Sequence, residues 1–501
     1  MKMKNLSYWV KSVKQDDFSK LDKEIYVDVA VIGGGITGLT TALMLSERNI
    51  NATIFEANEL GHGATGYTTA KVTCQHKLIY SDLINHIDED TARHYADANK
   101  TALENIRRII REYKIDCDFK TTSSNVYAGK KGNVEKLEKE FIAAKSLGFD
   151  IFLDKDVSLP FKAYANLRLE NQGIFHPVKY IKGITKALRD KAVQIYEHTR
   201  ITEIEKHDYY VLITDNRQKI YAKQVVIATK YPILNKKKLM FTKLYVERSY
   251  VVAAVMPNFR IDGYYINAEN EVRSIREYND NEERLILVAG ANHEAEDCEK
   301  AEQSYLELIK FSKELDEDAQ IRYKWSTQDC MTVDKMPYIG ELSDDMEGVY
   351  IATGYNKWGM NQSMVAAMIL SDAIAHTPEK WHNIFNLKRD INADAVKELI
   401  KQGADVARDY VKKLAPAEIY DIDLLMVGEG RIVKYDGDIV GAYKDETGEV
   451  FTIIPKCPHL GCRLKFNQAE KTWDCPCHAS RFTYKGEIID SPAIKKLDIK
   501  D

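Results

Sequence analysis

Two short segments near the C-terminal end of the chain combine cysteine and histidine in a fixed pattern. Cys457 and His459 form a C-x-H segment, and Cys475 and His478 form a C-x-x-H segment after the interval 460–474. Two thiolates and two imidazoles can bind a [2Fe–2S] cluster in which the cysteines hold one iron and the histidines hold the other. Two Cys and two His are also a zinc ligand set. Since either metal must join both segments, the pattern requires two loops to lie side by side.

The order of the ligands favours iron. Structural zinc sites usually pair Cys with Cys and His with His, whereas each segment here supplies one of each. The stretches 457–462 and 475–480 closely resemble the two cluster-binding loops of Rieske proteins. The resemblance implies a disulfide between Cys462 and Cys477 and a covering loop at 491–493, which contains Pro492. It also implies the four cluster ligands, which are Cys457, His459, Cys475 and His478.

Two positions depart from the Rieske pattern. Ala479 stands where the family usually has Gly, and this change is expected to shift the loop slightly. Phe482 stands where high-potential members have a Tyr whose hydroxyl bonds a ligand sulfur, although Ser480, which matches the Ser that bonds a bridging sulfide, is retained. Fewer hydrogen bonds to sulfur stabilise the reduced cluster less, so we expect a potential in the middle or lower part of the Rieske range.

Composition limits the classes of protein. A chain of 501 residues with 45% hydrophobic and 29% charged residues suggests about two to four globular folding units. The net charge of −5 argues against nucleic-acid binding. The N-terminus lacks the apolar core of a signal peptide, and no apolar run reaches the roughly 18 residues of a membrane span. Four of eight Cys lie within 457–477 and the others are scattered, which favours a cytoplasmic location over a secreted disulfide framework.

Residues 27–56 have the pattern of a dinucleotide-binding unit. An apolar strand at 27–32 leads into G-x-G-x-x-G at 33–38, a helix follows, and a second strand at 52–55 ends at Glu56. The glycines let the backbone turn sharply and approach a pyrophosphate, and the helix N-terminus favours the anion. An acidic residue at the end of the second strand accepts ribose hydroxyls. The unit therefore predicts FAD or NAD binding.

Four further stretches, 61–71, 225–229, 334–340 and 350–360, resemble FAD-contacting segments of the glycine/D-amino-acid-oxidase-like flavoproteins. The resemblance covers about residues 25–380, and the whole chain is similar to bacterial FAD-dependent oxidoreductases with a C-terminal Rieske domain. It implies FAD as the cofactor. Trp358 stands where relatives often have Gly or Ser, and its ring is expected either to stack at the flavin or to fill the core. The residues implied to contact FAD are Gly33, Gly35, Ile36, Thr37, Gly38, Glu56, Ala57, Thr65, Thr68, Thr69, Ile201, Gly354, Trp358, Gly359 and Met360.

The expected fold is α/β. A Rossmann-like FAD-binding domain of the glutathione-reductase/D-amino-acid-oxidase type is interrupted by a discontinuous α+β substrate domain and followed by an all-β Rieske domain. The predicted ranges are 25–90, 155–232 and 326–376 for FAD binding, 91–154 and 233–325 for the substrate domain, 377–417 for a helical linker and 418–501 for the Rieske domain.

A flavin accepts two electrons as a hydride, whereas the cluster accepts one, so both together predict a two-to-one electron converter. The sequence has no second G-x-G-x-x-G for NAD(P)H. The resemblance implies an amine or amino-acid substrate oxidised to an imine, with electrons leaving through the cluster to a quinone, a small redox protein or O₂. Alternatives are an oxidase with an accessory Rieske module, electron flow from a carrier to a substrate, and a non-enzymatic electron-transfer or redox-sensing protein.

Catalytic residues have no clear signature, because hydride transfer from a neutral amine needs no strong base. The candidates beside the second FAD segment are Lys71, Cys74 and His76, and attachment of the flavin through Cys74 or His76 is an open alternative. Candidates to bind a substrate carboxylate are Arg248, Arg273 and Arg276, since guanidinium groups bind carboxylates through two hydrogen bonds. Structural or surface roles are open for all of them.

Overall fold

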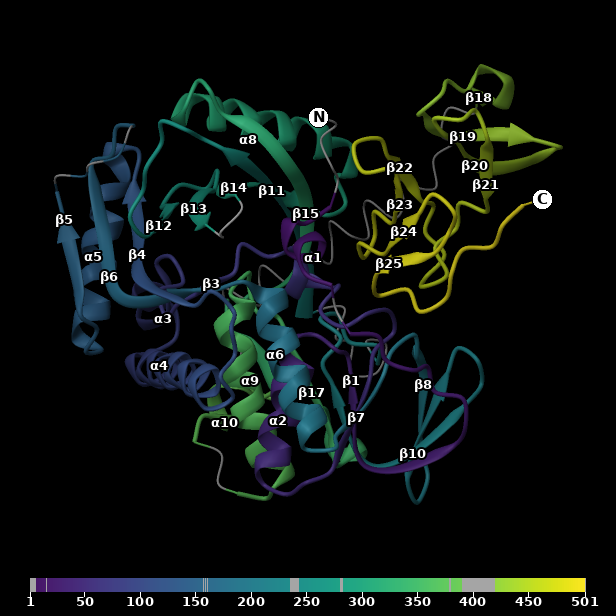
Figure 1. The fold of residues 1–501 in the computed structure, drawn as a ribbon, viewed down its shortest axis with the longest axis horizontal. Coiled ribbons are helices and arrows are strands. Elements are labelled where there is room, and N and C mark those ends of the chain that lie inside the picture. Colours follow the sequence, from purple (N-terminus) through teal and green to yellow (C-terminus); the bar gives the residue numbers. More distant parts are fainter. Residues whose placement is uncertain are drawn as a thin grey trace.

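The computed structural model describes residues 6–14, 16–155, 157, 159, 161–234, 243–279, 283–377, 380–389 and 420–500. Two large sheets and their helices form the body, and two small sheets at the C-terminal end lie beside it (Figure 1). Most of the predicted helical linker, 377–417, lies outside the described residues, and α10 (His382–Phe385) falls within its described part. Among the described residues, no helix has the length and apolar character needed to cross a membrane.

The eight-stranded sheet has a parallel core. It runs β16 (Tyr338–Glu341), β17 (Val349–Thr353), β10 (Lys219–Ile227), β1 (Ile25–Ile32), β2 (Ala52–Phe55) and β7 (Gln194–Tyr196), with β9 (Tyr210–Thr214) and β8 (Ile201–Lys206) joined to β10. Only β16, β8 and β9 pair antiparallel. Helix α2 (Ile36–Glu47) packs between α6 (Pro177–Asp190) and α9 (Gly359–Ile374). Because the parallel strands end at one edge, the loops after β1, β10 and β17 meet there.

The nine-stranded sheet is antiparallel except where β12 pairs with β4. It runs β15 (Gln320–Thr332), β11 (Leu244–Val255), β14 (Arg284–Glu294), β13 (Arg273–Asn279), β12 (Tyr264–Asn267), β4 (Lys120–Ala128), β6 (Ala165–Ile174) and β3 (Lys71–Val72), with β5 (Ile151–Asp154) beside β6. Helix α8 (Ala301–Leu315) packs on β11 and β14. Besides α10, the other helices in the described part of the body are α1 (Tyr8–Ser12), α3 (Ile79–His86), α4 (Glu89–Glu112) and α5 (Val134–Ser146).

The division of the body into domains stays a prediction, but three strands depart from it. β3, β6 and most of β15 come from ranges predicted to bind FAD, yet all three pair within the nine-stranded sheet. The sequence pattern could not show this, because the partners β4 and β11 are distant in the chain and strand pairing is set by tertiary packing.

The C-terminal part is all-β, as predicted. One sheet runs β18 (Tyr420–Asp421), β19 (Gly430–Tyr435), β20 (Asp438–Lys444) and β21 (Val450–Ile453), and the other runs β22 (Lys465–Asn467), β23 (Thr472–Asp474), β24 (Arg481–Thr483) and β25 (Ile488–Asp490). Trp473 and Phe482, which face each other across β23 and β24, are fully buried. Their core also contains Cys457 and Cys475, so the two cysteine-bearing loops are packed onto this sheet.

Candidate functional site

The glycine loop after β1 has no room for side chains at two positions. Gly33 has a φ of 111°, and a Cβ built there would lie 2.6 Å from the carbonyl oxygen of Ala228. A Cβ at Gly38 would lie 2.0 Å from the carbonyl oxygen of Gly33. The loop therefore packs backbone on backbone against β10 and α2, as a phosphate-binding turn requires.

Glu56 lies at the end of β2, where the ribose-binding acid was predicted. Its carboxylate accepts the backbone N–H groups of Gly34 at 2.7 Å and Asn58 at 2.8 Å. Burial raises the pKa of Glu56 above its usual value, although the two backbone donors and Arg200 act in the opposite direction. The residue thus joins the glycine loop to the next strand and keeps a carboxylate at the predicted ribose position.

A cavity of about 880 Å³ begins at this loop, within the size range of cofactor sites. It extends past the turn η1 (Ala64–Tyr67) to the N-terminus of α9. Every residue predicted to contact FAD lines it except Gly38, whose contact with Gly33 serves packing. The residues present therefore fit an FAD molecule, with the helix N-termini of α2 and α9 available for its negative charge. The contacts of individual residues with FAD stay predictions.

The α9 end of the cavity contains stacked rings. Trp358 lies over His76, with ring centroids 4.8 Å apart and planes 20° from parallel. His76 is hydrogen-bonded to the hydroxyl of Tyr95 at 2.7 Å and the carbonyl oxygen of Thr73 at 2.9 Å. Burial lowers the pKa of His76 to about 3, so the ring is neutral at pH 7. His76 is placed to support Trp358 while both line the cavity.

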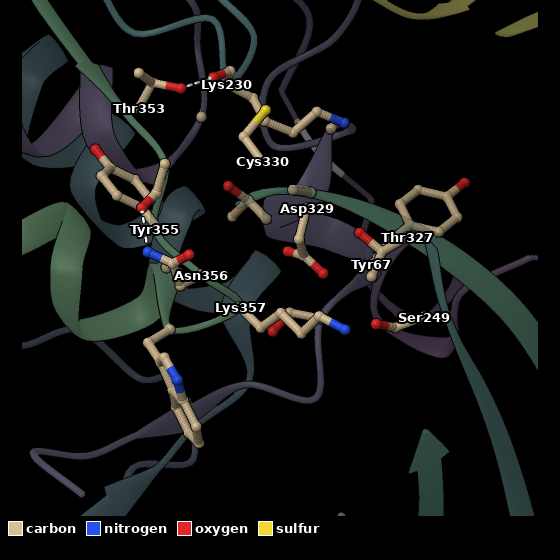
Figure 2. A pocket seen from close by; sticks show the side chains of 18 of the residues that line it. Tyr67, Lys230, Ser249, Thr327, Asp329, Cys330, Thr353, Tyr355, Asn356 and Lys357 are labelled. Carbon is tan, nitrogen blue, oxygen red and sulfur yellow. Dashed lines mark hydrogen bonds between the residues drawn. The ribbon is translucent and has the colours of Figure 1, made fainter. Parts of the chain in front are cut away.

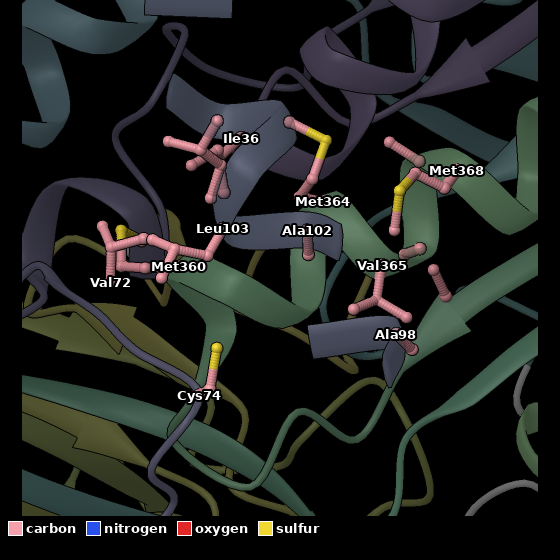
Figure 3. Packing of buried hydrophobic residues seen from close by; sticks show 14 of the residues in the cluster. Ile36, Val72, Cys74, Ala98, Ala102, Leu103, Met360, Met364, Val365 and Met368 are labelled. Carbon is pink, nitrogen blue, oxygen red and sulfur yellow. The ribbon is translucent and has the colours of Figure 1, made fainter. Parts of the chain in front are cut away.

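The other two candidates beside this segment lie in different surroundings. Cys74 is buried in the hydrophobic core near Val72 and Met360 (Figure 3), is not among the cavity-lining residues, and has its pKa raised to about 12 by burial. Lys71 does line the cavity, and burial followed by the charge of Arg276 lowers its pKa to about 7. Its ammonium group donates to the hydroxyls of Ser274 and Thr69.

The three arginines predicted to bind a carboxylate are each engaged elsewhere, and none is among the residues lining the cavity. Arg276 donates to main-chain carbonyl groups, including that of Phe175 at 3.0 Å. Arg273 pairs with Glu307 at 2.8 Å. Arg248 is fully buried and pairs with a carboxylate of the C-terminal part. Their surroundings therefore do not favour a carboxylate-binding role.

The cavity contains an acidic side chain that the sequence did not reveal. Asp329 projects from β15 into the cavity near Lys357 (Figure 2). No hydrogen bond or ion pair joins its carboxylate to any side chain in the described part of the structure, although Lys357 pairs with Glu247 at 2.6 Å. Burial raises the pKa of Asp329, and Lys357 and Lys230 act against that rise. No motif marks this position, because only the pairing of β15 with β11 turns it inward.

The predicted cluster ligands come together at one end of the C-terminal part. The rings of His459 and His478 are 5.0 Å apart and perpendicular. The thiol of Cys475 hydrogen-bonds that of Cys457, and this contact lowers the pKa of Cys457 below its usual value. Two cysteines that face each other and two histidines that face each other fit the two irons of a [2Fe–2S] cluster.

The remaining features of the two loops also follow the Rieske pattern. Cys462 and Cys477 form the predicted disulfide. Their sulfurs lie within 4.8 Å of that of Cys475, which alone of the three keeps a thiol for a metal. The covering loop is tied down where the backbone N–H of Ala493 donates to the Ser480 hydroxyl at 3.0 Å. Ala479 has a φ of 63°, which explains why Gly is usual at its position.

The cluster loops and the predicted FAD cavity share a wall. The cavity is lined in part by residues of the C-terminal domain from β25, the covering loop and the position after that loop, namely Ile488, Ile489, Asp490, Ser491 and Ile494. Strand β15 forms another part of this wall, since Gln328 donates to the carbonyl oxygen of Ala479 at 2.9 Å while Thr327 and Asp329 line the cavity. The predicted FAD site and cluster site are therefore adjacent within one chain.

Replacing Phe482 by Tyr should raise the midpoint potential of the cluster. Phe482 is buried in the core that contains Cys457 and Cys475, so a hydroxyl there can donate to a ligand sulfur and stabilise the reduced cluster. EPR-monitored redox titration of wild type and Phe482→Tyr measures the change. An unchanged potential would show that this position does not control it.

Family models match both parts of the chain. The model described as FAD dependent oxidoreductase matches residues 28–373, and the model described as Rieske [2Fe-2S] domain matches residues 419–500. The putative Rieske 2Fe-2S iron-sulfur protein YhfW of Bacillus subtilis (strain 168) is 35% identical over 493 residues, which cover 98% of this chain and 96% of that protein.

Other similar proteins match about three quarters of the chain. Gamma-glutamylputrescine oxidoreductase of Escherichia coli (strain K12) is 24% identical, over 76% of this chain and 91% of that protein. The crystal structure of glycine oxidase from Geobacillus kaustophilus has a TM-score of 0.61 at 18% identity, covering 73% of this chain and all of that one. L-proline dehydrogenase from P. horikoshii has a TM-score of 0.58 at 17% identity, covering 73% of this chain and 98% of that one. At these identities, the two structures show a common fold.

Proposed function

The chain belongs to the family of FAD-dependent oxidoreductases and carries a Rieske [2Fe–2S] domain, and from this we propose that it is an amine or amino-acid dehydrogenase. Its cofactors are FAD and a Rieske-type [2Fe–2S] cluster. In this proposal, electrons removed from the substrate leave the flavin one at a time through the cluster and pass to an external acceptor. The observation that carries it is the wall shared by the cavity and the cluster loops.

The chemistry of the two groups fits this order. When bound, FAD would accept a hydride from the carbon next to a substrate nitrogen, and the cluster would receive the electrons singly. The chain contributes a wall of the cavity on the cluster side, which is lined by residues of β15 and β25 and by Ser491 of the covering loop.

Support for a substrate with a C–N–H group comes from the relatives. The names of the similar proteins include gamma-glutamylputrescine oxidoreductase, glycine oxidase and L-proline dehydrogenase, and all share the fold or sequence of the body. We propose Asp329 as the group that takes a proton from the substrate ammonium, because only a neutral amine can give up a hydride readily. Its raised pKa and its carboxylate, which has no partner among the described residues, suit that role.

The experiment that tests the proposed function is anaerobic reduction of the holoprotein. Glycine, L-proline and gamma-glutamylputrescine are each added without oxygen, and absorption and EPR spectra are recorded together. We expect one of these amines to bleach the flavin and an EPR-active reduced cluster to follow. Bleaching without cluster reduction would indicate an oxidase that delivers electrons to O₂. No bleaching by any amine would favour electron flow toward a substrate or a non-enzymatic role.

Replacing Asp329 by Asn should slow reduction of the flavin by an amine that reduces the wild type. A positioned proton acceptor contributes roughly 10²–10⁴-fold to rate. In the wild type the rate should rise with pH as Asp329 loses its proton, and in the variant this part of the pH profile should disappear. Stopped-flow absorption across pH measures both effects.

Asp82→Asn is a matched control for this variant, since Asp82 also lines the cavity but is paired with Lys335 at 2.7 Å. We expect the flavin of Asp82→Asn to be reduced with the pH profile of the wild type. If the flavin of Asp329→Asn is reduced with that same profile, Asp329 does not accept the proton.

A further inference from the structure

Two side chains of the body bind the ligand loop 475–480 at both of its ends. Arg248 from β11 donates to the carboxylate of Asp474 at 2.6 Å, immediately before the ligand Cys475. Gln328 from β15 donates to the carbonyl oxygen of Ala479 at 2.9 Å, immediately after the ligand His478. The segment that supplies one cysteine and one histidine to the cluster is thus held between two fixed points.

Arg248 and Gln328 act as one unit. They are direct partners in the antiparallel pairing of β11 with β15, and Arg248 also donates to the side-chain oxygen of Gln328 at 2.8 Å. The Arg248 side chain is 0% exposed and that of Asp474 is 2% exposed. Paired strands within a nine-stranded sheet are rigid, so both contacts place the loop relative to the sheet rather than to a mobile segment.

A balanced set of buried and partly buried charges surrounds this contact. The cations are Arg248, Arg481 and Lys230, and the carboxylates are Asp474, Glu470 and Asp490. Arg481 pairs with Glu470 at 2.6 Å, and Lys230 of the body pairs with Asp490 of β25 at 2.5 Å. Tyr305 of α8 donates to Glu470 at 2.8 Å. All three carboxylates therefore belong to the C-terminal domain, whereas two of the three cations, Arg248 and Lys230, belong to the body.

Such a network fixes orientation more than it adds affinity. The attraction within a buried ion pair is offset by the cost of removing both charges from water. A shift of the C-terminal domain, however, would leave charges buried without partners, which is strongly unfavourable. The domain therefore has one orientation in which all six charges are matched.

We infer that Arg248 and Gln328 are positioning residues that fix the ligand loop 475–480 against β15, so that the Rieske domain stays docked on the body of its own chain. This inference deepens the proposed function, because a docked domain keeps the cluster beside the same cavity throughout turnover. Arg248 also balances the negative charge of Asp474 next to Cys475. Removing that balance disfavours the extra electron of the reduced cluster.

The test uses the holoprotein with redox mediators and needs no substrate or natural acceptor. Arg248→Met should shift the midpoint potential of the cluster downward in an EPR-monitored titration, because the Asp474 carboxylate loses its nearer counter-charge and keeps only Arg481, at 3.5 Å. Arg248→Met/Asp474→Asn has no unpaired charge and should return the potential toward that of the wild type. Arg284→Met is the matched control, since Arg284 lies on the neighbouring β14 and pairs with Glu277 within the body.

Docking itself is measured by hydrogen exchange of the loop 475–480. Exchange should be about tenfold or more faster in Arg248→Met/Gln328→Leu than in the wild type, because a charge-assisted and a neutral hydrogen bond are both lost. If Arg248→Met loses its cluster, hydrogen exchange of the loop is compared instead between the wild type and the triple variant Arg248→Met/Asp474→Asn/Gln328→Leu, which leaves no unpaired charge at this contact.

Unchanged potential in Arg248→Met together with unchanged exchange would overturn the inference. Since neither measurement involves an amine or an acceptor, this outcome is distinct from failure of the proposed function, which would show as an amine that does not bleach the flavin.

Discussion

Side chains alternate between the two faces of a β-strand, and in β15 this alternation joins the two halves of the molecule. Thr327 and Asp329 line the cavity that fits FAD, while Gln328 between them contacts the loop that carries two cluster ligands. The pairing of β15 with β11 then places Arg248 opposite Gln328 and completes the contact with Asp474. The two sites are adjacent because successive residues of one strand serve them.

Motifs within short stretches of sequence could be predicted well. The glycine loop, the two cysteine–histidine loops and the Cys462–Cys477 disulfide depend on backbone turns and ligand spacing that are local. The family, fold class and cofactors inferred from these motifs are confirmed by the family models. Even the departure at Ala479 has a local explanation, its left-handed backbone conformation.

Residues whose role depends on distant pairing could not be predicted. Asp329, Arg248 and Gln328 lie in strands with no motif, and only the register of β11 with β15 decides which face each one occupies. The same limit applies to Arg248, which the sequence alone presents as a candidate to bind a substrate carboxylate. A long cationic side chain in a sequence gives no sign of the buried partner that will neutralise it.

Burial also changes the chemistry of the candidates near the cavity. His76 is neutral and supports Trp358, and Lys71 has a pKa close to 7. Asp329 keeps a carboxylate without a partner among the described residues, beside a lysine that is already paired. Burial thus shifts the proton affinity of these side chains, and Asp329 is the acid that we propose to take up a proton.

The central claim is that electrons pass from the flavin to the cluster within one chain, and its most direct test is the dependence of cluster reduction on protein concentration. The holoprotein is mixed anaerobically with a reducing amine at several protein concentrations, and the reduced cluster is followed by freeze-quench EPR. We expect a first-order rate constant that stays the same at every concentration, because donor and acceptor are docked together. A rate constant that rises in proportion to concentration, or a cluster that stays oxidised while the flavin is reduced, would contradict the claim.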